Sequence, residues 1–331
     1  MTTGLSPEVS WAASQPDREW LIGNARLVDY SGLLLGAHIA HAGLIMLWAG
    51  TTAIVEALQF SPEVSLPEQG AILLPHLATL GFGIDASGTI VDPYPFFVVG
   101  ALHLVSSAVL GAGGLYHSLK GPKKLNNEFG WARKFHYDWA DGSSLSLVLG
   151  HHLIMLGIAA RLFVYKAIYW GGIYDPDLHA VRIVEHPTLN PLVIFGYLVG
   201  LHNGTWTAWG LASVDTLEDL VGGHAWISAI LILGGIFHLV ARPAKWALKR
   251  LRLSGDAILS YSLGSLAFMG FVSCAFIAHC NLVFPPEFYG TQRFTMVNAQ
   301  LLVATLALGG HLWHAYRART LMPQIEGPSE A

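Results

Sequence analysis

The stretch GGHAWISAILILGGIFHLV, residues 222–240, decides how the rest of the chain is interpreted. It contains no Asp, Glu, Lys or Arg, and as an α-helix it is about as long as the hydrocarbon core of a bilayer is thick. It nevertheless contains His224 and His238, fourteen residues apart. On a helix this spacing separates them by about 21 Å along the axis and returns both to nearly the same face. Because a polar group in hydrocarbon needs a partner, the stretch raises the question of what the two imidazoles contact within a membrane.

The composition of the whole chain indicates a membrane protein. Of its 331 residues, 53% are hydrophobic and 12% are charged, whereas an ordinary soluble domain has about 25% charged residues. A water-soluble protein of this size could not cover its surface with so few charges. We therefore expect an all-α integral membrane protein, in which lipid replaces water around most of the surface.

Uncharged runs long enough to cross a bilayer predict six membrane-spanning helices. They lie at about residues 30–55, 94–119, 143–169, 221–241, 257–284 and 294–316. A seventh uncharged run, 187–214, is interrupted by prolines and glycines. With six spans, fourteen of the 18 Lys and Arg residues fall on the side that holds both termini, as the positive-inside rule expects of a cytoplasmic face. We therefore interpret 187–214 as a structured, non-spanning part of an outer loop.

This map divides the chain into three parts. We expect a cytoplasmic segment at 1–26, a six-helix domain at 27–319 and a cytoplasmic tail at 320–331. Eleven of the 16 histidines fall in or at the edge of the spans. A lone histidine between helices usually hydrogen-bonds to a neighbour. Eleven histidines in spans that contain almost no Asp or Glu, however, do not have enough hydrogen-bond partners within the protein. Ligation of a cofactor within the membrane explains them better.

The spacing of His224 and His238 recurs in other spans. His103 and His117 are also fourteen residues apart, and Gln300, with a potential amide ligand, precedes His314 by the same interval. This repetition suggests three helix pairs related by approximate threefold symmetry.

Two cofactors suit such helices. A dihaem cytochrome b holds each iron between two imidazoles at about this spacing, whereas a chlorophyll magnesium needs one axial ligand. The close pairs His38 with His41 and His311 with His314 favour chlorophyll, because residues three apart on a helix each reach a separate part of its surface.

Several blocks of the chain resemble the six-helix chlorophyll-binding antenna family, which includes the inner antenna subunits of photosystem II and the IsiA and Pcb proteins. They are GNARLVDYSGLLLGAHIAHAGLIMLWAG, ILLPHLATLGFG, LHLVSSAVLGAGGLYHSLKGP, ILSYSLG, FPPEFYG and GHLWHAYRAR. The resemblance runs from about residue 20 to residue 319. It implies a non-enzymatic protein of a cyanobacterial thylakoid membrane that binds chlorophylls, carotenoids such as beta-carotene and lipids, and that transfers excitation energy to a photosystem. It implies no nucleic-acid partner.

The resemblance also implies a set of chlorophyll-binding residues. Those that match the family's ligands are His38, His41, His76, His103, His117, His152, His224, His238, His311 and His314. Gln300 stands where relatives carry histidine, so it either ligates magnesium or marks a weakened site. His136 resembles the IsiA and Pcb branch and is either a peripheral ligand or a loop residue. His151 matches a non-ligand position, and His179, His186, His202 and His279 are expected to be structural.

One departure from the family bears on the partner. The photosystem II core subunit has a very long outer domain between the last two spans, but this chain has only NLVFPPEFYGTQRF there. We therefore expect an accessory antenna that forms a belt with neighbouring copies or paralogues around the photosystem I core, with photosystem II as the alternative. Photoprotective quenching and, less favoured, a b-type haem carrier remain open, as does the pigment: chlorophyll a is expected, with b, d or f as alternatives.

Overall fold

The computed structural model describes residues 24, 27–66, 68–280, 282 and 286–320. The predicted terminal segments, 1–26 and 320–331, therefore lie almost entirely outside the described residues. Within the described part are six helices long and apolar enough to cross a membrane, the last of them from Arg293 onward, so the predicted six-helix membrane fold is confirmed. These helices are α2 (Ser31–Gln59), α4 (Tyr94–Leu119), α5 (Gly142–Ile168), α7 (Leu217–Val240), α9 (Gly255–His279) and α10 (Pro286–Thr320).

The predicted helix boundaries are accurate in some places and wrong in others. The second helix has the predicted bounds, residues 94–119. The fifth was predicted to continue to residue 284, but it ends at His279 because Cys280 adopts an extended conformation, with φ −79° and ψ 132°. The sixth helix begins at Pro286, but its part that is apolar enough to span a membrane begins at Arg293, next to the predicted residue 294. A proline is tolerated in the first turn of a helix, because the N–H group that proline lacks would have no acceptor within the helix at that position.

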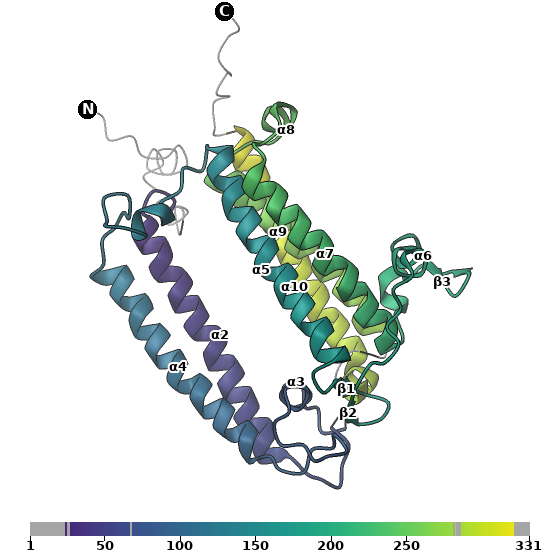
Figure 1. Cartoon of the computed structure of the whole chain (residues 1–331). Helices are drawn as coiled ribbons and strands as arrows, with labels where there is room; N and C mark the ends of the chain where they lie inside the picture. The colour runs from purple at the N-terminus through teal and green to yellow at the C-terminus, as the bar shows by residue number, and fades with distance from the viewer. Residues whose placement is uncertain (1–23, 25–26, 67, 281, 283–285, 321–331) are drawn as a thin grey trace, which may run out of the picture.

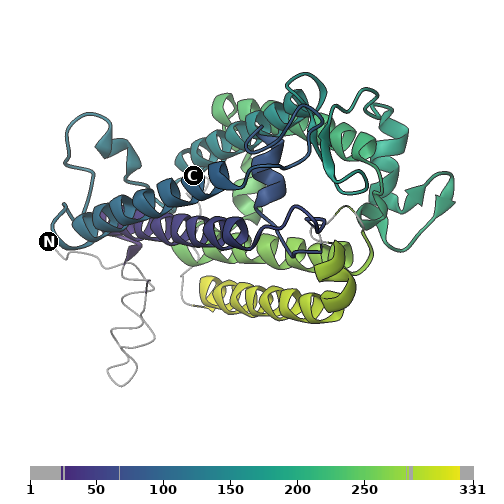
Figure 2. The ribbon, with the colours of Figure 1, turned by 90° about the horizontal axis from the view of Figure 1, so that it is seen from below.

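The long helices pack as three antiparallel pairs of consecutive helices. These are α2 with α4, α5 with α7, and α9 with α10, whereas helices of different pairs make few contacts in the part of the chain described. Figure 1 shows α2 and α4 side by side, apart from the other four helices, and Figure 2 shows the same grouping from below. The three helix pairs suggested by the repeated histidine spacing are therefore observed.

One end of the helices gathers the basic loops and both described ends of the chain (Figure 1). The loop after α4 lies on the start of α2, because the Gly32 N–H donates to the Lys123 carbonyl at 3.0 Å. The loop before α9 reaches the end of α10, where Arg252 donates to the Ala318 carbonyl at 3.2 Å. Two short helices, η3 (Ala132–Phe135) and α8 (Lys245–Arg250), belong to these loops. We call this the basic end.

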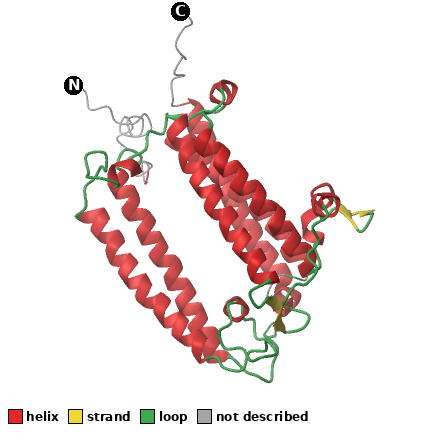
Figure 3. Ribbon diagram, in the orientation of Figure 1, coloured by secondary structure: helices red, strands yellow, loops and turns green. Residues whose placement is uncertain are grey.

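The opposite end, the outer end, carries longer loops folded into small elements (Figure 3). They are α3 (Leu74–Thr79), strands β1 (Ile173–Asp175) and β2 (Ala180–Arg182), α6 (Pro191–Gly196), η4 (Tyr197–Val199), strands β3 (Leu201–His202) and β4 (Thr205–Trp206), and η5 (Gly210–Ser213). Each strand pair is an antiparallel hairpin, with Tyr174 opposite Val181 and Leu201 opposite Trp206. Residues 187–214 thus form short elements and no spanning helix, as predicted.

Two small hydrophobic cores and one ionic contact hold the outer loops to the helix ends. Leu74 of α3 packs with Phe96 of α4 and with Tyr174 of β1. A second core joins β1 to the ends of α5 and α7. Arg182 donates to Asp175 at 2.5 Å and to Glu218 at 3.0 Å, and these carboxylates raise the pKa of its guanidinium, Glu218 most strongly. The long outer loop is therefore fixed on α7.

Candidate functional site

Four of the predicted ligand histidines are oriented by their own helical turn. In each, Nδ1 lies within hydrogen-bond distance of the carbonyl oxygen four residues earlier. The distances are 2.7 Å from His38 to Leu34, 2.6 Å from His76 to Ile72, 2.8 Å from His103 to Val99 and 2.8 Å from His224 to Leu220. Because a carbonyl oxygen only accepts, Nδ1 carries a proton, and in the neutral form of the imidazole the lone pair is then on Nε2. The hydrogen bond also fixes the direction in which Nε2 points.

Two histidines near the basic end are instead held by a serine of the partner helix. Ser146 of α5 lies 3.1 Å from Nδ1 of His238, and its hydroxyl donates to the His238 carbonyl at 3.1 Å. Ser260 of α9 does the same to His311 of α10, at 3.1 and 3.0 Å, and its carbonyl accepts from the His311 ring at 2.8 Å. The orientation of these two rings therefore depends on helix packing.

His314 contacts a buried carboxylate. Its Nδ1 donates to Asp256 Oδ1 at 2.6 Å, and the second oxygen of Asp256 lies 3.2 Å from Nε of Arg317. The side chains of Asp256 and Arg317 are each only 5% exposed. A carboxylate behind an imidazole fixes its tautomer and strengthens it as a metal ligand. The sequence interpretation placed Asp256 in a loop, just before the fifth span, and did not predict that it contacts His314. The sequence feature that could have indicated this contact is an acidic residue directly beside an apolar run.

His76 is positioned by a residue that the sequence interpretation also missed. The carboxylate of Glu56, near the end of α2, accepts hydrogen bonds from the backbone N–H groups of Ile72, Leu73 and Leu74 at 2.8 to 3.1 Å. These are among the donors that a helix start leaves unpaired. Glu56 therefore fixes α3, and with it His76, against the outer end of the first helix pair.

The other predicted ligand residues have varied surroundings. His41 and His152 are exposed on the surfaces of α2 and α5, and Gln300 is half-buried on the face of α10 that meets Gly270. The Nδ1 atom of His117 is buried and has no hydrogen-bond partner among the described residues. His136, in the basic loop, lies 2.8 Å from the Ser31 hydroxyl at the start of α2. The structure thus distributes the predicted residues over all three pairs and does not gather them into one centre.

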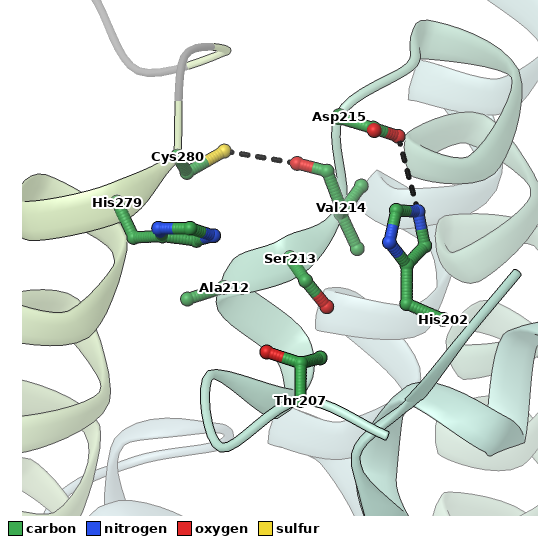
Figure 4. Close-up of a pocket in the computed structure, with 8 residues that line it drawn as sticks. All are labelled: His202, Thr207, Ala212, Ser213, Val214, Asp215, His279 and Cys280. Carbon is green, nitrogen blue, oxygen red and sulfur yellow. Dashed lines mark hydrogen bonds and ion pairs between the residues drawn. The ribbon is translucent and has the colours of Figure 1, made fainter. Parts of the chain in front are cut away.

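Two of the histidines expected to be structural line a cavity at the outer end. His202 lies 3.5 Å from Asp215, and His279 stacks on Trp209 with ring centroids 4.8 Å apart. Figure 4 shows both around a cavity of about 240 Å³, with Cys280 donating to the Val214 carbonyl. Burial raises the pKa of the Cys280 thiol. These contacts join the outer loop to the end of α9, in keeping with a structural role.

The surface around the candidate ligands is apolar. Leu44, Ile45 and Trp48, which follow His41 on α2, are each about half exposed or more, and Leu102, beside His103 on α4, is 60% exposed. Among the described residues, no three His, Cys, Asp or Glu side chains meet to form a metal centre. The candidate histidines therefore lie singly on apolar helix surfaces and are not grouped around one metal ion.

Comparisons with known proteins identify the family of this chain. Residues 17–297 match the family described as Photosystem II protein. The chain is 53% identical to the chlorophyll a/b light-harvesting protein Pcb of Fischerella muscicola, over 96% of this chain and 98% of that protein. It is 52% identical to the chlorophyll a/b light-harvesting protein PcbC of Prochlorothrix hollandica, over 92% of this chain and 80% of that protein. The chain therefore belongs to the Photosystem II protein family, within the Pcb/IsiA type of six-helix antenna proteins.

Proposed function

We propose that this protein is an accessory light-harvesting antenna of a cyanobacterial thylakoid membrane, which binds chlorophylls and carotenoids and passes excitation energy to a photosystem. The observation that carries the proposal is the orientation of the histidines. Where Nδ1 donates to a backbone carbonyl, as in His38, His103 and His224, the lone pair of Nε2 is available on an apolar helix. The two relatives, named as chlorophyll a/b light-harvesting proteins, support the same function.

The residues proposed to bind chlorophyll are those whose types and surroundings suit an axial ligand. They are His38, His41, His76, His103, His117, His152, His224, His238, His311 and His314, with Gln300 and His136 as additional candidates. When bound, chlorophyll supplies the absorption of light and the dipole coupling through which excitation moves. The chain's own residues fix the position, tilt and spacing of the rings.

The helices set two layers of binding positions. His103 and His224 lie toward the outer end, whereas His117 and His238 lie fourteen residues further along the same helices, at the basic end. This separation is about 21 Å along the axis. Hydrogen bonds to carbonyls limit rotation of the His103 and His224 rings, and Ser146 limits that of His238, so these residues would keep the spacing and orientation that energy transfer requires.

The partner we propose is the photosystem I core, with neighbouring copies or paralogues completing a belt. Two features support an accessory antenna: α9 and α10 are separated only by residues 280–285, and the helices expose apolar surface to lipid or to neighbours. The basic end would face the cytoplasm. Isolation of the native supercomplex tests this proposal, and we expect the protein to co-purify with photosystem I. If it co-purifies with photosystem II alone, photosystem II is the partner.

Loss of one ligand tests the function directly. We expect His238→Leu to lower the chlorophyll content of the purified protein by about one per chain, while the control His186→Leu, in the outer loop, leaves it unchanged. Both are measured as extracted pigment per protein. An unchanged content in His238→Leu would refute that ligand, and a purified protein with a reducible haem spectrum and no red absorption band would refute the antenna function.

Harvesting and quenching differ in fluorescence lifetime. If the protein is an antenna, we expect a long lifetime in the isolated protein and a markedly shorter one when it is bound to a photosystem, because excitation is transferred. A lifetime that is equally short in both states would favour the photoprotective alternative.

A further inference from the structure

A histidine of α5 outside the proposed ligand set has the geometry of a ligand. Nδ1 of His151 lies 2.8 Å from the carbonyl oxygen of Leu147, four residues earlier. This is the arrangement found in His38, His76, His103 and His224. The carbonyl requires a proton on Nδ1, so in the neutral form of the imidazole Nε2 is an acceptor with a free lone pair. Within the described part of the chain, the ring makes no other hydrogen bond.

His151 lies beside the contact between α5 and α7 and takes no part in it. That contact runs along Gly150 and Gly157 of α5, where an added Cβ atom would come within 2.8 Å of Gly235 O and 2.7 Å of an Ile232 side-chain carbon, respectively. His151 follows Gly150 and therefore points about 100° away around the helix. Its imidazole is exposed, as are Leu147 and Met155 on the same side.

The position of His151 along α5 makes an unpaired acceptor costly. The helix begins at Gly142, so His151 lies about 14 Å along it, well within a bilayer whose hydrocarbon core is about 30 Å thick. Lipid chains offer no donor, so leaving a polar group unsatisfied in such surroundings is unfavourable. An axial bond to a metal would use this lone pair, and the apolar neighbours would contact the ring that carries the metal.

We infer that His151 is the axial ligand of an additional chlorophyll, beyond the set carried over from the antenna family. The inference rests on the proposed function. Because consecutive helix residues point about 100° apart, His151 and His152 would hold rings on different sides of α5. Two chlorophylls would then be bound through adjacent residues, at nearly the same depth in the membrane.

The test is the chlorophyll content of the purified full-length protein. We expect His151→Leu to lose one chlorophyll per chain, His152→Leu to lose a different one, and the double variant to lose two. Leu162→Met, a substitution at an exposed position of α5 that lies about 16 Å further along the helix, should lose none. Visible circular dichroism of each variant should identify the two losses as distinct, because each removes a different chromophore.

The outcomes separate this inference from the proposed function. A wild-type protein without chlorophyll would overturn both. A normal chlorophyll content in His151→Leu, with one chlorophyll lost in His152→Leu, would overturn only the role of His151. If His151→Leu cannot be purified, His151→Gly is prepared with and without added imidazole, which can occupy the vacated space as a ligand. One chlorophyll regained with imidazole supports the inference, and no change overturns it.

Discussion

The first and third helix pairs reach the same antiparallel arrangement through different contacts. In α2/α4, Gly36, Gly43 and Gly50 of α2 follow one another at intervals of seven residues and are all buried. The backbone of α4 lies directly against them: a Cβ atom on Gly50 would be 2.7 Å from the Gly100 carbonyl oxygen. In α9/α10, the buried Asp256 contacts both His314 and Arg317.

This difference shows two ways of holding helices together in lipid. Lipid chains are as apolar as the side chains, so an apolar side chain gains little by moving from lipid to a neighbouring helix. Association of the helices therefore depends on close packing of small residues or on polar contacts. In α4, His103 contacts the carbonyl of Val99 in its own helix. In α10, His311 contacts the hydroxyl and the backbone carbonyl of Ser260, and His314 contacts the carboxylate of Asp256, both residues of α9. Pigment sites on α10 should therefore depend on the neighbouring helix more than those on α4.

The largest expected effect is at the buried carboxylate. Asp256→Ala removes the partner of His314 and one partner of Arg317, and breaking a buried ion pair costs about 3–5 kcal/mol. We expect a clearly lower midpoint of thermal unfolding, followed by circular dichroism, and loss of the pigment assigned to His314. Glu128→Ala, which removes an exposed carboxylate from a loop at the basic end, is the control. Equal stability of the two variants would show that the ionic contact is unimportant.

A smaller effect is expected at the glycine contact. Gly50→Ala places a methyl group against the backbone of α4, and overpacking of this kind costs about 1–3 kcal/mol. Gly111→Ala is the matched control in the same pair, because a Cβ atom there meets nothing within 4 Å. We expect the unfolding midpoint to fall only for Gly50→Ala. If the two variants unfold together, close backbone packing does not hold α2 to α4.

The smallest effect concerns the remaining pair, α5/α7, and depends on pH. Asp141 caps α5 by accepting from the backbone N–H groups of Ser143 and Ser144, and its pKa is lowered, chiefly by the hydrogen bond from the Ser144 hydroxyl. The stabilisation is therefore complete above the pKa of an unfolded Asp, about 3.9. It is lost as the pH falls through the lowered pKa of the folded protein.

Asp141→Asn tests this dependence, since asparagine caps a helix without titrating, and a cap contributes about 1 kcal/mol. We expect the variant to match the wild type at pH 7 and to lose less stability than the wild type between pH 5 and pH 3. The control is Glu128→Gln, which should follow the wild-type curve. Parallel curves for Asp141→Asn and the wild type would exclude this carboxylate as the source of the pH dependence.

The accuracy of the sequence interpretation depends on whether the deciding interaction is local. The bounds of α4 were predicted because an uncharged run between polar loops marks a span without reference to any neighbour. The end of α9 was misplaced because residues 280–284 are as apolar as the helix before them, and hydropathy alone cannot mark where the backbone turns. Glu56 was missed because its partners, the N–H groups of residues 72–74, belong to a different segment.

The sequence by itself determined that this is a membrane protein with six helices and with histidines at repeated helical intervals. Composition and a period of 3.6 residues are properties of each segment alone. Only the tertiary structure decided what orients the imidazoles of His238 and His314: a serine of α5 for His238 and a buried carboxylate of α9 for His314. These contacts depend on the relative rotation and depth of two packed helices, which no single segment encodes.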